Sequence, residues 1–278
     1  MPETLLLEIL SFILGAIIGS FLNVCIFRIP RDKSIVRPGS SCPGCGAPIR
    51  FYDNIPLISY LIILRGKCRK CGEPISIRYA AVELLTALLF AAIVALFGLS
   101  VDAAAALIFA CILIVISFID LEFQIIPDIF SLGGLLLGMI LSFVRTPPFF
   151  GQEILVPFGS LPAILQSLLG VLLGGGILYA IARLYEVVRK AEGMGGGDIK
   201  LLAMIGAFCG ITGVVFSLVA GSIVGALVGL PLMLIKGKDT KYAVPFGPFL
   251  SLGALLYVFA GDTLINAINA LFRLPYRS

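Results

Sequence analysis

Seven apolar stretches without a charged residue interrupt this chain of 278 residues and restrict what it can fold into. They cover residues 9–27, 84–101, 103–119, 129–144, 154–182, 201–235 and 242–261. One α-helix needs about 20 apolar residues to cross the hydrocarbon core of a bilayer. The stretch that begins at residue 201 is long enough for two short crossings that turn within residues 209–213. The pattern therefore predicts a membrane protein with about eight transmembrane helices.

Composition excludes the soluble alternative, because 59% of the residues are hydrophobic and only 13% are charged. A chain of this length cannot hide so much apolar surface in one water-soluble core. The first stretch follows Glu3 and Glu8 rather than lysine or arginine. It is therefore expected to stay as a transmembrane helix rather than to act as a cleaved signal peptide.

The segment from Arg28 to Arg78 contains ten basic and three acidic residues, which gives it a net charge of +7. Basic loops stay on the cytoplasmic side of a membrane. When the later crossings alternate from there, Asp120 and Asp198 emerge at the same cytoplasmic face from different helices. The sequence thus predicts that two acids distant in the chain come close together.

Asp120 follows the apolar stretch 103–119, and Asp198 closes the glycine-rich run 193–198. A carboxylate at membrane depth is costly and by default indicates a functional site. The chain contains no histidine, so Ser-His and Cys-His nucleophile pairs and HExxH zinc hydrolysis are excluded. Two carboxylates that share a proton remain as the simplest acid and base.

Each acid also has a purely structural interpretation. Asp120 could end a helix at the headgroup layer, and Asp198 could cap a helix that begins at Ile199. The glycines before Asp198 could let an extended substrate lie against the backbone, which favours function, or could serve close helix packing. Such packing is also the role expected of four glycines in the fifth stretch, Gly170, Gly174, Gly175 and Gly176. Two rival acids, Asp128 and Glu122, are interpreted as a helix cap and a surface charge.

Four cysteines in the basic loop form two CxxC pairs, Cys42 with Cys45 and Cys68 with Cys71. The 22 residues between the pairs match a zinc-ribbon pattern. Disulfides are the alternative, but a reducing cytoplasm disfavours them. Four sulfur ligands close the coordination shell, so the zinc is expected to be structural rather than catalytic. The other three cysteines, Cys25, Cys111 and Cys209, are interpreted as small buried hydrophobic residues.

The expected fold is an all-α polytopic membrane protein with a small zinc-ribbon-like cytoplasmic domain between its first two helices. Three domains are expected. Residues 1–27 form the first transmembrane helix, 28–79 the zinc-binding loop domain, and 80–278 a transmembrane domain that carries both acids.

Several motifs in order resemble those of one family, the bifunctional prepilin peptidases, which are membrane aspartic proteases with a GxGD motif. They lie in residues 19–30 (Gly-Ser-Phe-Leu-Asn-Val-Cys-Ile-Phe-Arg-Ile-Pro), 52–60, 65–68 and 75–79. Asp120, ahead of an Ile-Pro-Asp, and Asp198, closing Gly-x-Gly-Asp, match the two catalytic aspartates of the family. The chain departs from the family pattern where tyrosine or phenylalanine replaces tryptophan near positions 51 and 60, and where Ala80 replaces a frequent proline.

The resemblance implies an enzyme of the bacterial inner membrane that removes the leader peptide of type IV prepilins or type II secretion pseudopilins. It also implies N-methylation of the new N-terminus with S-adenosylmethionine. Asp53, Gly66 and Glu83 in and beside the loop are expected to help hold this methyl donor, with zinc only bracing the loop. A basic leader would not be attracted to the +7 loop, so lipid headgroups or acids such as Glu122 are expected to recognise it. No nucleic-acid partner is expected.

Two other classes of function stay open at this point. A transporter that binds cations through intramembrane acids would use Asp120 and Asp198 but would give the cysteines no role. A zinc-ribbon scaffold that docks a partner at the membrane would use the cysteines and leave the acids without a role. Cleavage of a prepilin in detergent separates all three possibilities.

Overall fold

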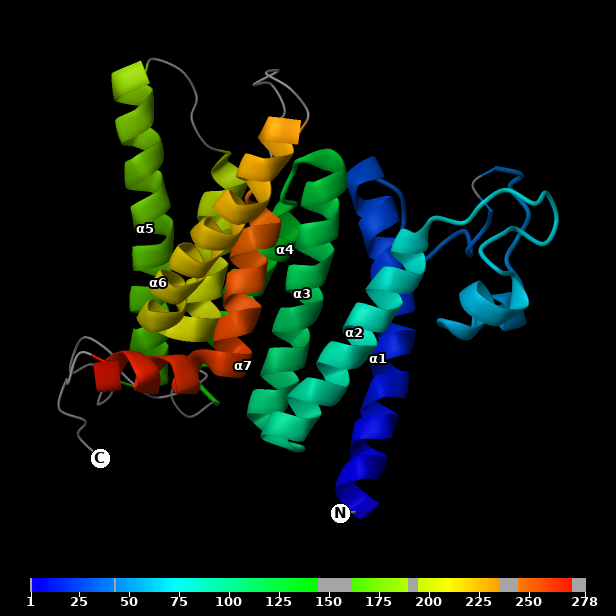
Figure 1. Ribbon diagram of the computed structural model, residues 1–278, viewed down its shortest axis with the longest axis horizontal. Helices are drawn as coiled ribbons and strands as arrows, with labels where there is room; N and C mark the ends of the chain where they lie inside the picture. Colours follow the sequence, from blue (N-terminus) through cyan, green and yellow to red (C-terminus); the bar gives the residue numbers. More distant parts are fainter. Residues whose placement is uncertain (1, 43, 145–161, 190–194, 236–244, 272–278) are drawn as a thin grey trace. The chain divides into compact units, whose positions relative to one another are not determined.

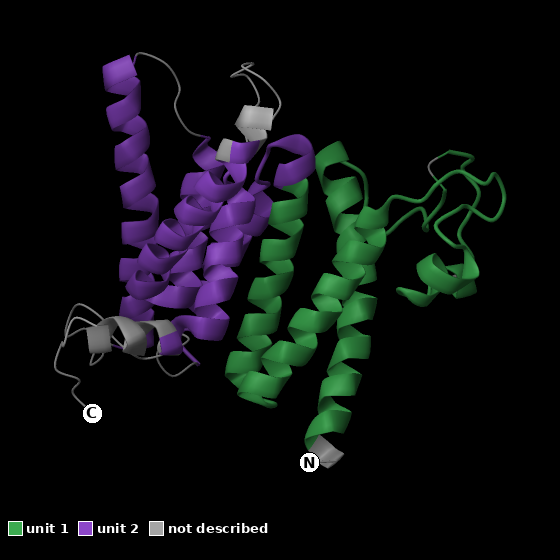
Figure 2. Cartoon of the chain, in the orientation of Figure 1, with its two compact units in different colours: residues 1–119 green, residues 120–278 purple. Residues whose placement is uncertain are grey.

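The structure is a computed structural model, and it describes residues 2–42, 44–144, 162–189, 195–235 and 245–271. The chain divides into two compact units, residues 1–119 and 120–278, which Figure 2 shows in different colours. The first unit contains both CxxC pairs, and the second contains Asp120 and Asp198.

Seven α-helices dominate the described residues (Figure 1). They are α1 (Pro2–Arg28), α2 (Ile77–Phe97), α3 (Val101–Phe123), α4 (Asp128–Leu141), α5 (Ala163–Arg189), α6 (Gly196–Ile235) and α7 (Gly247–Leu271). Three short helical turns lie between α1 and α2, namely η1 (Ile29–Arg31), η2 (Phe51–Asp53) and η3 (Ser59–Ile63). Over the described ranges the β-structure consists of two isolated bridges, Ser41 with Pro48 and Lys67 with Pro74. The prediction of an all-α fold is confirmed.

Five helices are long and apolar enough to cross a membrane, namely α1, α2, α3, α5 and α6. Two further apolar helices are shorter, α4 and the first part of α7 (Gly247–Gly261). α6 is interrupted at Gly210, whose φ of 65° and ψ of −166° are open to glycine but not helical. This turn, which was predicted within residues 209–213, divides α6 into a first arm (196–209) and a second arm (211–235). Counted this way, the described residues contain eight apolar helical segments, and a crossing of the membrane by each of them stays a prediction.

In the first unit, α1 and α2 lie antiparallel. A Cβ on Gly19 would lie only 2.8 Å from the Cα of Glu83. One turn further along α1, Nδ2 of Asn23 donates a hydrogen bond at 2.9 Å to the carbonyl of Tyr79. Small residues at such positions let the backbones of two membrane helices approach closely.

In the second unit, α5 lies antiparallel to the first arm of α6. Oγ of Ser167 donates to the carbonyl of Ala207 at 2.8 Å. A Cβ on Gly170 would lie 2.9 Å from the carbonyl carbon of Gly206, and one on Gly174 would strike the backbone of Leu202 in the same way. The prediction of close helix packing is therefore confirmed for Gly170 and Gly174 but is wrong for Gly176, where a Cβ would meet nothing within 4 Å.

The second arm of α6 runs antiparallel to α7. A Cβ on Gly221 would lie 2.8 Å from the carbonyl oxygen of Phe249, and one on Gly253 would lie 3.0 Å from the Cα of Ser217. The chain thus turns back at Gly210, runs along the second arm, and returns along α7 (Figure 1).

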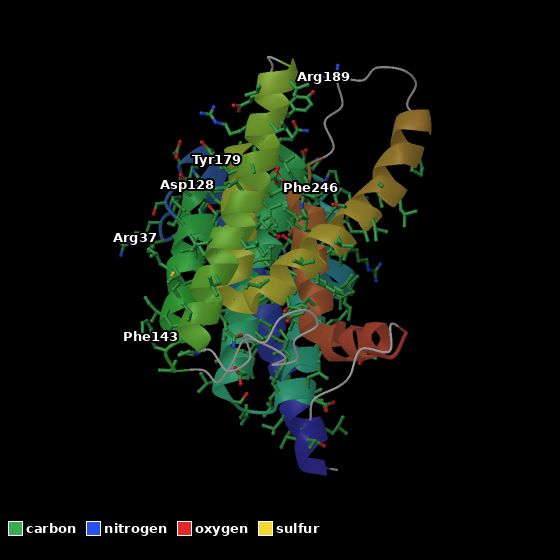
Figure 3. All side chains as sticks on the ribbon, turned by 90° about the vertical axis from the view of Figure 1, so that its left-hand side faces the viewer. Arg37, Asp128, Phe143, Tyr179, Arg189 and Phe246 are labelled. Atoms are coloured by element: carbon green, nitrogen blue, oxygen red, sulfur yellow. The ribbon has the colours of Figure 1, made fainter. Side chains whose placement is uncertain are left out.

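α4 runs parallel to the first arm of α6. The first residue of α4, Asp128, pairs with Lys200, and a Cβ on Gly138 would lie 2.8 Å from the ring of Phe208. The starts of α4 and α6 therefore share one end of the unit with the end of α5. Figure 3 shows Asp128, Phe246 and Arg189 in the upper part of the view, and Phe143, beyond the other end of α4, lower down.

Candidate active site and metal centre

Asp120 lies in the last turn of α3 and is only 5% exposed. Its Oδ2 accepts a hydrogen bond at 3.1 Å from the backbone N–H of Gly247, the first residue of α7. The N-terminus of a helix carries partial positive charge. The start of α7 therefore gives this buried carboxylate both a hydrogen-bond donor and a favourable dipole.

Asp198 lies in the first turn of α6, directly after three glycines. It is half-buried and lies close enough to Asp120 for the two carboxylates to interact electrostatically. A Cβ on Gly195 or Gly196 would meet nothing within 4 Å, so the backbone beside Asp198 is accessible. The structure thus brings together the two acids that the sequence singled out.

Ile126, in the connection between α3 and α4, packs against the neighbours of both acids. A Cβ on Gly197 would lie 2.9 Å from the Cβ of Ile126, and one on Gly247 would lie 3.2 Å from its Cδ1. The side chain of Ile126 therefore packs between Gly197, the residue before Asp198, and Gly247, the residue that donates to Asp120. Only glycine leaves room for Ile126 at both positions.

The rival acids have other roles. Oδ1 of Asp128 forms an ion pair with Nζ of Lys200 at 2.6 Å, and both side chains are exposed. The residue that caps α4 is Pro127, so the interpretation of Asp128 as the helix cap is wrong. Its carboxylate instead links the starts of α4 and α6. Glu122 is exposed, as expected of a surface charge.

The pair of Asp120 and Asp198 suits acid and base chemistry. Two carboxylates that interact in this way cannot both ionise cheaply, so one of them tends to keep its proton. The ionised member can accept a proton from water, and the neutral member can donate one to a leaving group. This arrangement needs no histidine, and the sequence contains none.

The cysteines of the loop form a compact cluster in the first unit. The Sγ atoms of Cys42, Cys45, Cys68 and Cys71 all lie within 4.8 Å of one another, and those of Cys42 and Cys71 are 3.8 Å apart. A tetrahedral zinc ion with Zn–S bonds of about 2.3 Å requires sulfur atoms about 3.8 Å apart. The donor set and its spacing therefore fit a metal ion of this kind.

The two CxxC turns fold in the same way. In each, the first cysteine donates to the carbonyl five residues later, and the glycine after the second cysteine donates back to the first. The bonds are Cys42 to Ala47 at 2.9 Å, Gly46 to Cys42 at 2.8 Å, Cys68 to Glu73 at 2.8 Å and Gly72 to Cys68 at 2.9 Å. Gly46 and Gly72 have φ of 67° and 74°, which favours glycine. The backbone N–H groups of Cys71 and Lys70 lower the pKa of the Cys68 thiol to about 6, because they stabilise the thiolate that binds metals.

Asp53, one of the expected methyl-donor residues, is held by an arginine. Its carboxylate accepts hydrogen bonds from Nη2 of Arg69 at 2.6 Å and from Nε at 3.0 Å. This guanidinium holds the pKa of Asp53 below its ordinary value. The side chain is only 7% exposed, so it braces the loop beside the second CxxC turn.

Gly66 and Glu83 also have contacts within the first unit. Gly66 has φ of 71°, and its N–H donates to the carbonyl of Tyr60 at 2.9 Å. Glu83 is buried in α2, where its Oε2 accepts from the backbone N–H of Leu57 at 2.8 Å and so ties the loop to the helix. Contact of any of these residues with a methyl donor stays a prediction.

Sequence reasoning missed Gly247 and Ile126, which flank the acids. The available signal for Gly247 was its place between Phe246 and Pro248, within the apolar stretch 242–261. A glycine there indicates a close backbone approach, but the sequence does not say to what. Ile126 entered the sequence analysis only as part of the Ile-Pro-Asp that follows Asp120, and nothing in the sequence placed its side chain beside both acids.

Comparison with known proteins identifies the chain. The family model described as the bacterial peptidase A24 N-terminal domain matches residues 13–97, and that of the type IV leader peptidase family matches residues 107–230. Similar proteins named prepilin leader peptidase/N-methyltransferase occur in Myxococcus xanthus, Pseudomonas aeruginosa and Neisseria gonorrhoeae. Their identities to the chain are 40% over 237 residues, 33% over 277 and 32% over 292.

These alignments cover 84%, 91% and 96% of this chain and 65%, 90% and 96% of the respective relatives. No solved structure matches the chain. The two family models lie in the same order along the chain as the cysteine cluster and the aspartate pair. On this evidence the chain, with its apolar helices, is a membrane protein of the type IV leader peptidase family.

Proposed function

We propose that this protein is an aspartic endopeptidase that removes the leader peptide of type IV prepilins or type II secretion pseudopilins, and that Asp120 and Asp198 are its catalytic residues. The observation that carries the proposal is the meeting of these two acids, from the end of α3 and the start of α6. Relatives that match most of the chain are named prepilin leader peptidases, which supports the same substrate class.

The proposed reaction is hydrolysis of one peptide bond. Water attacks the scissile carbonyl while the ionised aspartate takes one of its protons. The neutral aspartate donates a hydrogen bond to the carbonyl oxygen and then gives its proton to the leaving amine. The accessible backbone at Gly195 and Gly196 suits an extended substrate segment beside Asp198.

We further propose that the loop binds one structural zinc ion through Cys42, Cys45, Cys68 and Cys71. The sulfur cluster fits such an ion, and its four ligands would close the coordination shell. The metal would hold the two CxxC turns together and so give the loop a fixed shape.

The second proposed activity is N-methylation of the trimmed substrate, for which S-adenosylmethionine supplies an activated methyl group. The donor is cationic, and Asp53 in the loop and Glu83 near the start of α2 supply carboxylates of opposite charge, which supports this assignment. Gly66 keeps the adjoining turn in its left-handed conformation. Relatives that carry N-methyltransferase in their names support the same activity.

The proposed location is the bacterial inner membrane, with the acids at the cytoplasmic face. The basic character of the loop supports this orientation, because positively charged loops stay inside. A substrate anchored in the bilayer by its own apolar helix would then present its scissile bond at the level of the two acids. Its leader would meet lipid headgroups and local acids such as Glu122.

Cleavage of a purified prepilin by the full chain in detergent tests the proposal. Asp120→Asn and Asp198→Asn each remove a titrating carboxylate with little change in shape, so each should abolish cleavage while the protein still folds. Asp128→Asn is the matched control, since it removes an acid of the same type at the same end of the unit. It should keep substantial activity, because exposed ion pairs contribute only about 0–1 kcal/mol. Full activity of either of the first two variants would refute the assignment.

A further inference from the structure

We infer that the backbone N–H of Gly247 decides which aspartate is the base: Asp120 carries the negative charge, and Asp198 carries the shared proton. This assignment rests on the proposed peptidase function and adds the roles within the pair. Gly247 acts through Asp120 and is therefore a positioning residue.

The hydrogen bond from Gly247 favours the ionised form of Asp120 and so opposes burial, which favours the neutral form. Its Oδ2 accepts the Gly247 N–H at 3.1 Å in a buried setting. A hydrogen bond donated to a carboxylate stabilises the charged form more than the neutral one. Gly247 is the first residue of α7, and the first N–H groups of a helix have no partner within the helix. Pro248 has no N–H of its own, so Gly247 supplies the donor at this point.

The environment of Asp198 favours its neutral form. Within the described ranges, no donor reaches its carboxylate, although Asp120 acts on it electrostatically. A negative Asp120 makes ionisation of Asp198 more costly. The other charged side chains that the structure describes at this end of the unit are Lys200 on α6, Asp128 on α4, Glu122 on α3, and Arg183, Glu186 and Arg189 on α5, where Arg183 pairs with Glu186. Lys200 is already paired with Asp128.

The same glycine is required for steric reasons. A Cβ at position 247 would lie 2.6 Å from Oδ2 of Asp120 and 3.2 Å from Cδ1 of Ile126. The carboxylate would have to move away from the N–H that binds it. Any other L-residue at this position would therefore disturb the base.

The roles give a balanced reaction. Asp120 accepts a proton from the attacking water, a C–O bond forms, and the C–N bond breaks. Asp198 gives its proton to the leaving amine. At the end the proton lies on Asp120, and it returns to Asp198 or exchanges with solvent before the next turnover.

The direct test replaces the Phe246–Gly247 amide by an ester, which exchanges the N–H for an oxygen and adds no side chain. A hydrogen bond to a charged group is worth roughly 1.5–3 kcal/mol. The acid limb of the kcat/KM profile against pH should therefore move up by about one to two pH units. The alkaline limb should stay in place, because it reports the loss of the proton from Asp198 while Asp120 is already ionised. An alkaline limb that moves while the acid limb stays would reverse the roles and overturn the inference.

A second test uses Gly247→Ala, with Gly133→Ala as its matched control. A Cβ at Gly133 meets nothing within 4 Å, so this variant should cleave like the unaltered protein. Gly247→Ala should lower kcat about 100-fold or more with little change in KM, because it displaces the base rather than the substrate. An unchanged kcat for Gly247→Ala would also overturn the inference.

These outcomes differ from a failure of the proposed function. If the unaltered protein does not cleave prepilins, the peptidase assignment itself is wrong. If it cleaves them and the ester leaves both limbs in place, only the role of Gly247 is wrong.

Discussion

Replacing Gly206 by alanine should separate α5 from the first arm of α6. A Cβ at this position would overlap the carbonyl of Gly170 and would lie 2.8 Å from the backbone nitrogen of Val171. Both are backbone groups inside a helix, so neither can rotate away. Favourable contacts to carbon begin near 3.5 Å, so the helices must part by roughly 0.7 Å or more.

Overpacking of this kind costs typically about 1–3 kcal/mol. Alanine also favours a helix over glycine by about 1 kcal/mol, which offsets part of that cost. Gly176→Ala is the matched control, because Gly176 lies in α5 and its Cβ would meet nothing within 4 Å. The helix preference is common to both variants, so Gly206→Ala should be about 1–3 kcal/mol less stable than Gly176→Ala.

Reversible unfolding of the full chain in detergent measures this difference. A further variant, Gly170→Ala with Gly206→Ala, tests the mechanism, because both methyl groups enter the same gap. Once the helices have parted, the second methyl group costs little. The double variant should therefore lose less stability than the sum of the losses of the two single variants, by at least about 0.5 kcal/mol. Equal stability of Gly206→Ala and Gly176→Ala would refute the reasoning.

Three further predictions concern other parts of the chain. Metal analysis should find one zinc ion per chain, and Cys42→Ser should lower the zinc content and expose the remaining loop thiols to labelling, because it opens a closed site; a protein without zinc and with reactive thiols would contradict this. Glu83→Gln, like changes at Asp53 or Gly66, should reduce methylation more than cleavage when processed substrate is analysed by mass spectrometry; normal methylation of a pre-cut pilin together with lost cleavage would contradict that division. Asp128→Lys combined with Lys200→Asp should restore the stability that either single change loses, since the pair is re-formed with reversed charges; a double variant no better than the worse single one would exclude a direct interaction.

The parts of the site that the sequence predicts are those with a chemical reason in the sequence itself. Asp120 and Asp198 stand out because charge is rare beside long apolar stretches, and alternation of the crossings places them at one face. The CxxC spacing predicts the sulfur cluster because each turn aims two thiolates locally. Gly210 could be located because 35 apolar residues are too many for one crossing.

The parts that sequence reasoning missed depend on how distant segments pack. Gly170 and Gly174 pack against the backbone of another helix. In the same run, a Cβ on Gly175 would make only an ordinary contact at 3.5 Å, and one on Gly176 would meet nothing within 4 Å. The composition of the run does not distinguish these four glycines. Gly247 lies 127 positions after Asp120 in the sequence. It becomes the hydrogen-bond partner of Asp120 only because α7 starts where α3 ends. Asp128 has the form of a helix cap in the sequence, but the nearby lysine on α6 takes its carboxylate.

The turn at Gly210 makes the first arm of α6 short, and this arm is buried in protein. An arm of 14 residues extends about 21 Å, less than the hydrocarbon thickness of about 30 Å. Every residue from 201 to 210 is buried against protein, whereas Leu5 and Ile13 of α1 are 58% and 51% exposed. The arm that carries Asp198 is therefore packed as part of the protein core rather than as a lipid-facing helix. Its side chains are constrained by shape as in a soluble protein, so an exchange of one apolar residue for another, harmless on the outer face of α1, can displace the active site.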